Sequence, residues 1–221
     1  MPARRTDDPA LLGMEGKQNW PHTPWGMDGG RFGKVVDVAV CDPEGNFLFN
    51  KPVVEEGPHV ITLPYALDPE NGLPKLALIR EQRDTAAALD GVDSPQFWGP
   101  PRGYAEQTDE GLIAAGLREA GEEAGVSVLT AQPWIVATDT NPNETIVRSK
   151  SPWIALPIDM TQLSAIQNDR DVKIFKAEFF SEYQLEDMIR AGEYDGASTR
   201  SWCLATAVLY FRLFVLPTIV R

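Results

Sequence analysis

The alternation of apolar and polar positions along the chain first indicates strands. Residues 34–41 (KVVDVAVC) are rich in valine and partly alternate, which is typical of a strand with one buried face. The turn residues DPEGN at 42–46 and LDPENGLP at 67–74 separate apolar runs from one another. We expect further strands at residues 47–50, 59–65, 76–80, 126–138, 153–157 and 172–179.

Helical periodicity appears in later segments. Residues 109–124 have an apolar side that suits packing against a sheet. This side consists of Ile113, Leu117, Ala120 and Ala124. A last helix is expected at about residues 198–214.

A further helix is expected directly after Ser181. Ser181 and Gln184 fit a capping box, and Phe180 and Leu185 fit a hydrophobic staple across the helix start. Gly192 is the expected end of this helix. Strands, one helix, more strands and then two helices predict an α/β (α+β) fold with helices on the faces of a mixed sheet.

The first 33 residues differ from the rest. Glycine and proline are frequent there, which favours an irregular arm, and Trp20 and Trp25 indicate that this arm packs onto another surface. At 221 residues, the chain is long for one domain and short for two. We therefore expect an N-terminal arm at residues 1–33 and one enlarged domain at residues 34–221.

Composition and charge exclude several classes of protein. Hydrophobic residues make up 43% of the chain, so a sizeable core can form. Two cysteines rule out a disulfide scaffold and a cysteine-based zinc site. The formal net charge of −12 argues against a nucleic-acid partner, because such binding needs basic side chains on the phosphates.

Location is also expected from the pattern of apolar residues. No secretory signal is visible, because residues 1–16 lack a long apolar run. Residues 203–220 are apolar but contain Arg212 and Pro217, so a buried or subunit-contact helix is expected rather than a membrane span. The sequence therefore predicts a cytoplasmic protein without a membrane partner.

The chemistry of the chain is concentrated in one helix. Glu119, Glu122 and Glu123 are spaced i, i+3 and i+4, so their carboxylates share one face, and we call them the glutamate cluster. A divalent cation such as Mg²⁺ would remove their mutual repulsion. A solvated acidic surface would need no cation, but it leaves unexplained why Gly111, Gly116 and Gly121 lie inside the predicted helix.

These residues resemble a known family. Residues 118–126 (REAGEEAGV) match the core of the Nudix box, R-E-U-x-E-E-x-G-U, in which U is a bulky or aliphatic residue. Glu110 precedes Arg118 by the required seven intervening residues. Six residues instead of five separate Gly103 from Glu110, and Ala120 is small for a U position.

Looser matches resemble the ADP-ribose pyrophosphatase subgroup. Residues 79–83 (IREQR) are similar to its V-R-Q-Y-R strand end, and residues 98–103 (WGPPRG) to its W-E-x-P-x-G entry to the box. Gly99 stands where the subgroup has glutamate. Pro142 is similar to a downstream proline of the subgroup, and residues 179–209 to its closing helix pair.

The resemblance implies an α/β/α sandwich and a metal-dependent site. Glu119, Glu122 and Glu123 would bind Mg²⁺ or Mn²⁺, and a backbone carbonyl near Gly103 would add a ligand. Glu119 is also a candidate base. Arg118 would hold the glutamates through charge-assisted hydrogen bonds. Glu110 would orient the loop and helix or reach the metal through water.

Other site residues keep alternative interpretations. Asp169, Asp171 and Glu144 are candidate bases, although each is also an ordinary loop acid, and Glu144 follows the substrate-side candidate Pro142. Two arginines and one tryptophan complete the candidates. Arg80 and Arg83 would bind a phosphate or the terminal ribose or form surface ion pairs, and Trp98 would stack on a base or belong to the core.

The resemblance implies hydrolysis of a nucleoside diphosphate linked to another moiety, with ADP-ribose or a related nucleotide sugar as the expected substrate. Dinucleotides, coenzyme A derivatives and damaged nucleoside triphosphates stay open. The alternative is a non-catalytic Nudix-fold sensor of nucleotide sugars. The resemblance also implies a homodimer, with contacts expected from residues 1–33 and 203–220.

Overall fold

The computed structural model describes residues 3–5, 23–25, 33–42, 44, 46–83, 96–106, 108–126, 132–140, 147–148, 150–163 and 172–219. The chain divides into two compact units. Unit 1 contains Met1–His59, Tyr104–Glu106 and Asp139–Ser151, and unit 2 contains Val60–Gly103, Gln107–Thr138 and Pro152–Arg221. The predicted single domain from residue 34 onward stays a prediction.

Unit 1 is built around a hairpin of β3 (Gly33–Cys41) and β4 (Phe47–Glu56). Its turn is closed by Asp42, whose carboxylate accepts a hydrogen bond from the Asn46 backbone N–H at 2.7 Å. Three short strands complete the sheet: β1 (Ala3–Arg5) and β2 (Thr23–Trp25) pair antiparallel with β3, and β10 (Val147–Arg148) pairs parallel with β4. The N-terminal arm, expected to be irregular, therefore contains two short strands.

Most of the larger mixed sheet lies in unit 2. Its order is β13, β14, β7, β6, β5, β11, β9, with β12 also on β6 and β8 on β5. β5 pairs antiparallel with β6 and parallel with β11. The strands are β5 (His59–Leu67), β6 (Pro74–Arg83), β7 (Gln96–Gly99), β8 (Arg102–Tyr104), β9 (Trp134–Thr140), β11 (Lys150–Pro157), β12 (Val172–Ser181), β13 (Glu193–Tyr194) and β14 (Ala197–Ser198).

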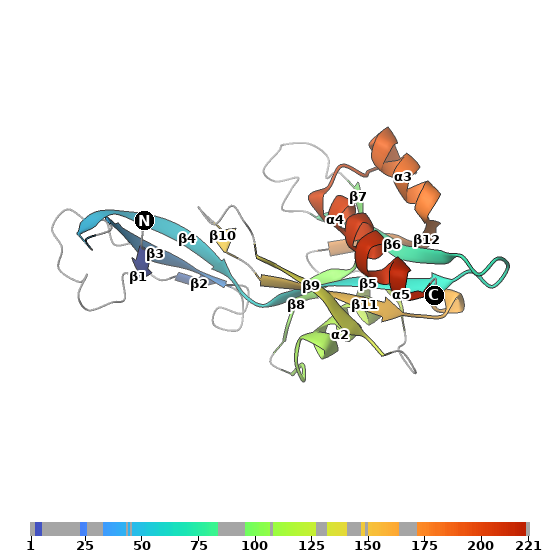
Figure 1. The fold of residues 1–221 in the computed structure, drawn as a ribbon, viewed down its shortest axis with the longest axis horizontal. Coiled ribbons are helices and arrows are strands. Elements are labelled where there is room, and N and C mark those ends of the chain that lie inside the picture. The colour runs from blue at the N-terminus through green and yellow to red at the C-terminus, as the bar shows by residue number, and fades with distance from the viewer. Residues whose placement is uncertain are drawn as a thin grey trace. The chain divides into compact units, whose positions relative to one another are not determined.

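Helices cover both faces of this sheet (Figure 1). α2 (Leu112–Ala124) lies on one face, and α3 (Glu182–Ala191) and α4 (Trp202–Tyr210) lie on the other. Alternation along β6 explains the two cores, because Leu76 and Leu78 pack with α3 and α4 whereas Ile79 packs with α2. The expected α/β/α arrangement is thereby confirmed within unit 2. A short 3₁₀ turn, η1 (Met160–Gln162), follows β11.

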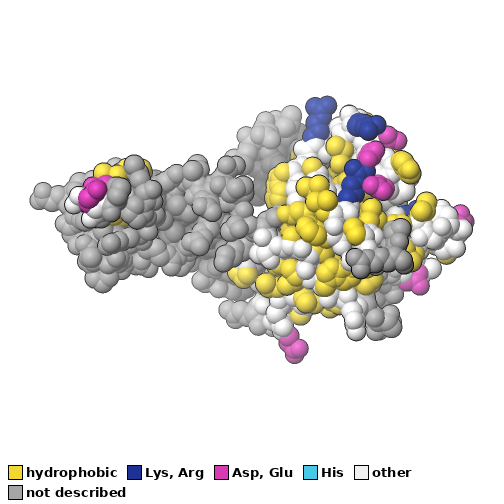
Figure 2. All heavy atoms as spheres, viewed as in Figure 1, with side chains coloured by type: hydrophobic (Ala, Val, Ile, Leu, Met, Phe, Trp, Pro, Cys, Tyr) yellow, Lys and Arg dark blue, Asp and Glu magenta, His cyan; other side chains and the backbone are white. Residues whose placement is uncertain are grey.

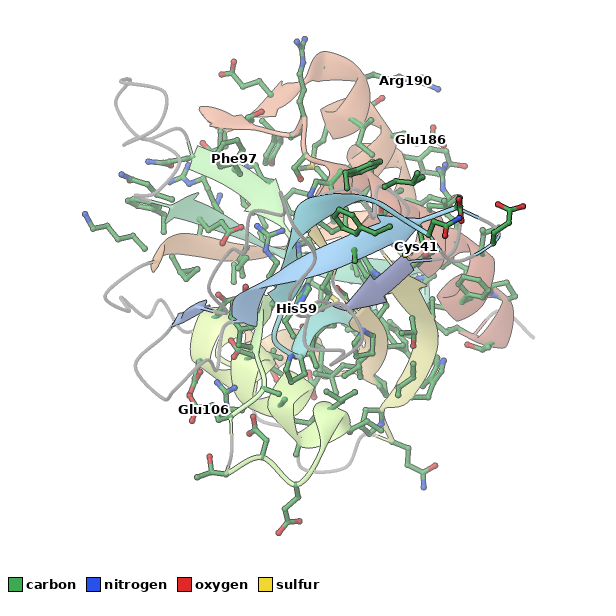
Figure 3. All side chains as sticks on the ribbon, turned by 90° about the vertical axis from the view of Figure 1, so that its left-hand side faces the viewer. Cys41, His59, Phe97, Glu106, Glu186 and Arg190 are labelled. Atoms are coloured by element: carbon green, nitrogen blue, oxygen red, sulfur yellow. The ribbon has the colours of Figure 1, made fainter. Side chains whose placement is uncertain are left out.

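The predicted caps of α3 are confirmed. The Ser181 hydroxyl accepts from the Gln184 backbone N–H, and the Gln184 side chain accepts from the Ser181 backbone N–H. Gly192 ends the helix at a φ of 78°, a conformation that glycine adopts without strain. Glu186 and Arg190 project outward from α3 and form an i, i+4 ion pair (Figure 3).

The C-terminal helix begins and ends later than predicted. α4 starts at Trp202, after the Ser201 cap, and continues through a π-helical turn, η2 (Phe211–Val215), into α5 (Leu216–Ile219). By length and composition, Trp202–Ile219 is the one helix of the described chain able to cross a membrane, and a third of it is buried. Its buried side includes Cys203, Leu204, Ala207, Val208, Phe211 and Val215. Leu209, Leu213 and Phe214 are exposed on an apolar surface (Figure 2).

Candidate active site

α2 lies very close to the sheet. A Cβ on Gly116 would meet Ile154 Cδ1 at 2.7 Å and Thr62 Cγ2 at 3.2 Å, so a glycine is needed for this approach. Thr62 also fixes the segment that leads to the helix, because its backbone N–H and its hydroxyl both donate to the Pro101 carbonyl, at 2.9 and 3.0 Å. We call residues 100–103 the site loop. The packing of α2 and the bonds from β5 therefore bring helix and site loop together.

Two members of the glutamate cluster face the site loop. Glu119 and Glu123 are buried, and Glu123 Oε2 accepts a hydrogen bond from the Arg102 backbone N–H at 2.8 Å. A Cβ on Gly103 would overlap the carboxylate of Glu119. The Glu119 carboxylate thus lies directly against the Gly103 backbone, and a side chain at position 103 would require that carboxylate to move. The predicted metal ligand from the backbone near Gly103 stays a prediction.

The pKa of Glu119 is raised to about 7. Burial is the main cause, and the Arg118 guanidinium opposes it. Glu122 and Asp109 raise the pKa further through repulsion. A bound cation would favour the ionised carboxylate, so this environment suits a positively charged ligand.

Arg118 links three acidic side chains. Its Nη1 lies 2.8 Å from both Glu119 Oε1 and Glu122 Oε2, and its Nη2 lies 3.2 Å from Asp109 Oδ2. Glu122 is half-exposed. These charges, together with the hydrogen bonds that Arg118 donates to Asp109, outweigh burial and raise the pKa of the guanidinium. Arg118 therefore orients the cluster and offsets part of its charge.

Asp109 is a site residue that the sequence reasoning missed. Its carboxylate accepts from Arg118 Nε and Nη2, both at 3.2 Å, whereas Glu110 is exposed in the turn before α2. The box spacing contained the signal, because Asp109 follows Gly103 after five residues and Glu110 precedes Arg118 by seven. The extra residue of this chain splits the acidic position between two neighbours, and Asp109 makes the contact.

The donor set fits a hard divalent cation. Carboxylate oxygens are the ligands that Mg²⁺ and Mn²⁺ prefer, and the absence of a side chain on Gly103 lets one of these carboxylates lie against the backbone. Within the described ranges, no three His, Cys, Asp or Glu side chains converge closely enough to hold a metal as they stand. Glu122 is paired with Arg118.

The remaining candidates lie apart from this cluster or outside the described residues. Arg80 donates to the Asp195 carbonyl and carboxylate, at 2.8 and 3.0 Å. Trp98 is fully buried against Phe180, and its indole N–H donates to the Tyr194 carbonyl at 2.9 Å. Arg83 ends β6, and nothing is described of its side chain. Pro142, Glu144, Asp169 and Asp171 lie outside the described residues.

A hollow occurs elsewhere in unit 2, beside the β13–β14 hairpin. It is lined by Gln96, Ala191, Gly192, Glu193, Gly196, Ser198 and Arg200. None of the glutamates of α2 lines it. The glutamate cluster and this hollow therefore lie in different parts of unit 2.

Comparisons with known proteins give likenesses of fold. No protein-family model matches the chain, and neither does any curated protein sequence. A solved structure described as an ADP compounds hydrolase is similar over 93% of this chain and 98% of its own, with a TM-score of 0.59 and 13% identity. The NUDIX domain of Shewanella oneidensis NrtR, complexed with ADP ribose, covers 78% of this chain and 92% of its own, with a TM-score of 0.49 and 16% identity.

The first of these structures covers nearly the whole chain, and at its level of identity it establishes the fold alone. The same α/β/α order with a mixed sheet is implied by the REAGEEAGV motif, which here forms the part of α2 that faces the site loop. The chain accordingly shares the α/β/α fold of this ADP compounds hydrolase, with a mixed sheet between helices.

Proposed function

We propose that this chain is a metal-dependent pyrophosphatase that hydrolyses a nucleoside diphosphate linked to another moiety, with ADP-ribose or a related nucleotide sugar as substrate. One observation carries the proposal: the buried carboxylates of Glu119 and Glu123 lie against the site loop, one on the Gly103 backbone and one on the Arg102 N–H. The fold shared with an ADP compounds hydrolase supports the substrate class.

Glu119, Glu122 and Glu123 would hold Mg²⁺ or Mn²⁺. When bound, the metal neutralises the pyrophosphate and lowers the pKa of a water molecule. Phosphoryl transfer depends on positioning and charge neutralisation, so the protein has to fix these carboxylates rather than form a covalent bond. Arg118, on the same helix, fixes them through its ion pairs, and Asp109, in the turn before the helix, pairs with Arg118.

Glu119 is suited to accept a proton. A base works best when its pKa is close to the working pH, and the metal-free Glu119 has a pKa of about 7. Cation binding lowers this value, because it stabilises the carboxylate. Glu119 would thus act as a ligand when the cation is bound and could accept a proton only without it, so Asp169, Asp171 and Glu144 stay proposed as alternative bases.

The test is product release from a substrate panel with Mg²⁺. The panel holds ADP-ribose, sugar nucleotides, NADH, a coenzyme A derivative, a dinucleoside polyphosphate and 8-oxo-dGTP. We expect AMP from ADP-ribose, a loss of at least about 100-fold in Glu122→Gln, and no turnover with a chelator. Glu186→Gln is a control, since Glu186 also pairs with an arginine four residues away on its own helix, α3.

Each outcome has a defined meaning. Cleavage of another compound in the panel would support the proposed reaction but would assign a different substrate. Equal activity in Glu122→Gln and wild type would contradict the role of the cluster. No turnover combined with thermal stabilisation by ADP-ribose would replace the enzyme with a non-catalytic sensor.

A further inference from the structure

A second buried charge pair adjoins the glutamate cluster. Glu81 Oε1 lies 2.7 Å from Arg102 Nη2, and the Glu81 side chain is only 1% exposed. Glu81 lies two positions after Ile79 on β6, so it belongs to the sheet face that α2 covers. The chain therefore buries a carboxylate on the face of the sheet that carries the candidate active site.

The pair is connected to the cluster through the backbone. Arg102 uses its guanidinium for Glu81 and its backbone N–H for Glu123 Oε2. The next residue, Gly103, lies against the Glu119 carboxylate. Glu123 thus contacts Arg102, and Glu119 contacts the next residue, Gly103. The ion pair with Glu81 ties Arg102 to the sheet.

Gly99 lies beside the pair. In the sheet, Gly99 is opposite Ile79, and Phe97 is opposite Glu81. A Cβ on Gly99 would lie 3.9 Å from Glu81 Oε1, which is an ordinary van der Waals contact. The glycine that departs from the subgroup pattern therefore coincides with an acidic side chain on the neighbouring strand.

Stability alone is a weak reason for such a pair. Desolvating two charges costs free energy, and buried ion pairs are often no better than apolar replacements. The hydrogen bond from Arg102 Nη2 to Glu81 Oε1 does fix geometry, because it ties the Arg102 side chain to one point on β6. This points to a role in holding the site loop.

We propose that Glu81 and Arg102 are positioning residues that hold the site loop against Glu119 and Glu123, and so set the affinity of this site for a divalent cation. The inference rests on the proposed metal-dependent function. It assigns no contact between Glu81 and substrate. Partners in the layer around metal ligands change affinity by roughly 10- to 100-fold when removed.

The first experiment titrates purified, metal-free protein with Mn²⁺ and measures free Mn²⁺ by electron paramagnetic resonance. We expect Glu81→Gln and Arg102→Lys to weaken Mn²⁺ binding by about tenfold or more. Asp68→Asn is the control, because Asp68 and Lys75 form an ion pair of similar length, 2.9 Å. The side-chain exposures are also similar, at 9% for Asp68 and 24% for Lys75 compared with 1% for Glu81 and 23% for Arg102. It should bind Mn²⁺ like the wild type.

The second experiment needs no metal. Hydrogen exchange at the Arg102 amide should be faster in Glu81→Gln than in wild type, because the bond to Glu123 opens more often. If Glu81→Gln fails to fold, Arg102→Lys still tests the pair, because it keeps both charges and removes only the guanidinium group. Variants that lose thermal stability but keep the wild-type Mn²⁺ affinity and Arg102 protection would overturn the positioning role. A wild type that binds no Mn²⁺ and cleaves nothing would instead overturn the proposed function.

Discussion

At the scale of single residues, Glu119 has an environment with a measurable consequence. Its side chain is buried beside other acids, and the Arg118 guanidinium only partly compensates for the lost hydration. The ordinary pKa of glutamate applies when the chain is unfolded, whereas the folded, metal-free protein has a value of about 7. The folded state therefore binds more protons than the unfolded state between these two values.

This difference predicts the pH dependence of stability. The contribution of Glu119 is fully present below its unfolded pKa and is lost as the pH rises through about 7, by about 3 kcal/mol. Urea unfolding of metal-free wild type and Glu119→Gln, near pH 5 and near pH 8, measures it. The variant should gain about 2–3 kcal/mol relative to wild type across that interval. A constant difference between the two proteins would show that Glu119 titrates normally.

The residues of the site were partly predictable from the sequence. The i, i+3, i+4 spacing places the glutamates on one helix, and the family resemblance supplies Arg118 as their partner. Asp109 was missed because its exposed neighbour Glu110 has the seven-residue spacing to Arg118, whereas Asp109 has the five-residue spacing to Gly103. Glu81 gave no local signal, since only the pairing of distant strands brings it to Arg102.

At the scale of elements, the distance between α2 and the sheet depends on one glycine. Gly116 faces Ile154 and Thr62 across a gap too small for a methyl group. Gly121, on the same helix, would place its Cβ at 3.4 Å from the Val126 carbonyl, which is an ordinary contact. Only one of these two interior glycines is therefore explained by packing.

The two glycines predict opposite changes in stability. Gly116→Ala should lower the free energy of unfolding by about 1–3 kcal/mol through overpacking. Gly121→Ala should be neutral or should gain up to about 1 kcal/mol, because alanine favours the helix. Chemical denaturation of both variants provides the comparison. Equal effects would argue against the close approach of α2 to β5 and β11.

Elements with local signals were predicted better than those without. The caps of α3 depend on residues adjacent in sequence, and they occur as expected. β7, β8, β13 and β14 are short and owe their strand geometry to pairing partners elsewhere in the chain. Of the strand expected from Val126, β9 is described from Trp134 onward, and residues 127–131 lie outside the described residues. Val126 itself packs with Ala120 and Ala124 of α2.

At the scale of the whole molecule, the C-terminal helix contributes one side of the larger hydrophobic core. Its apolar composition left a buried helix, a subunit contact and a membrane span as alternatives. The structure buries Phe211 completely and leaves Leu213 57% exposed. Composition alone could not separate these sides, because both are apolar.

Two substitutions distinguish the sides. Phe211→Ala should lower the free energy of unfolding in detergent-free buffer by about 3–5 kcal/mol. Leu213→Ala should change it by less than about 0.5 kcal/mol. A comparable loss in Leu213→Ala would contradict this packing and would place Leu213 in a contact such as the predicted dimer interface. Light scattering of both variants reports the oligomeric state.

The contacts of Arg118 have a consequence for how the protein is supplied with metal. A guanidinium already offsets the repulsion between Glu119 and Glu122, so folding does not have to wait for a cation, unlike in small zinc domains. If the proposed function holds, removing the cation abolishes activity without unfolding the protein. A cell would then control the output of existing molecules through its free magnesium, and recovery would require no new synthesis.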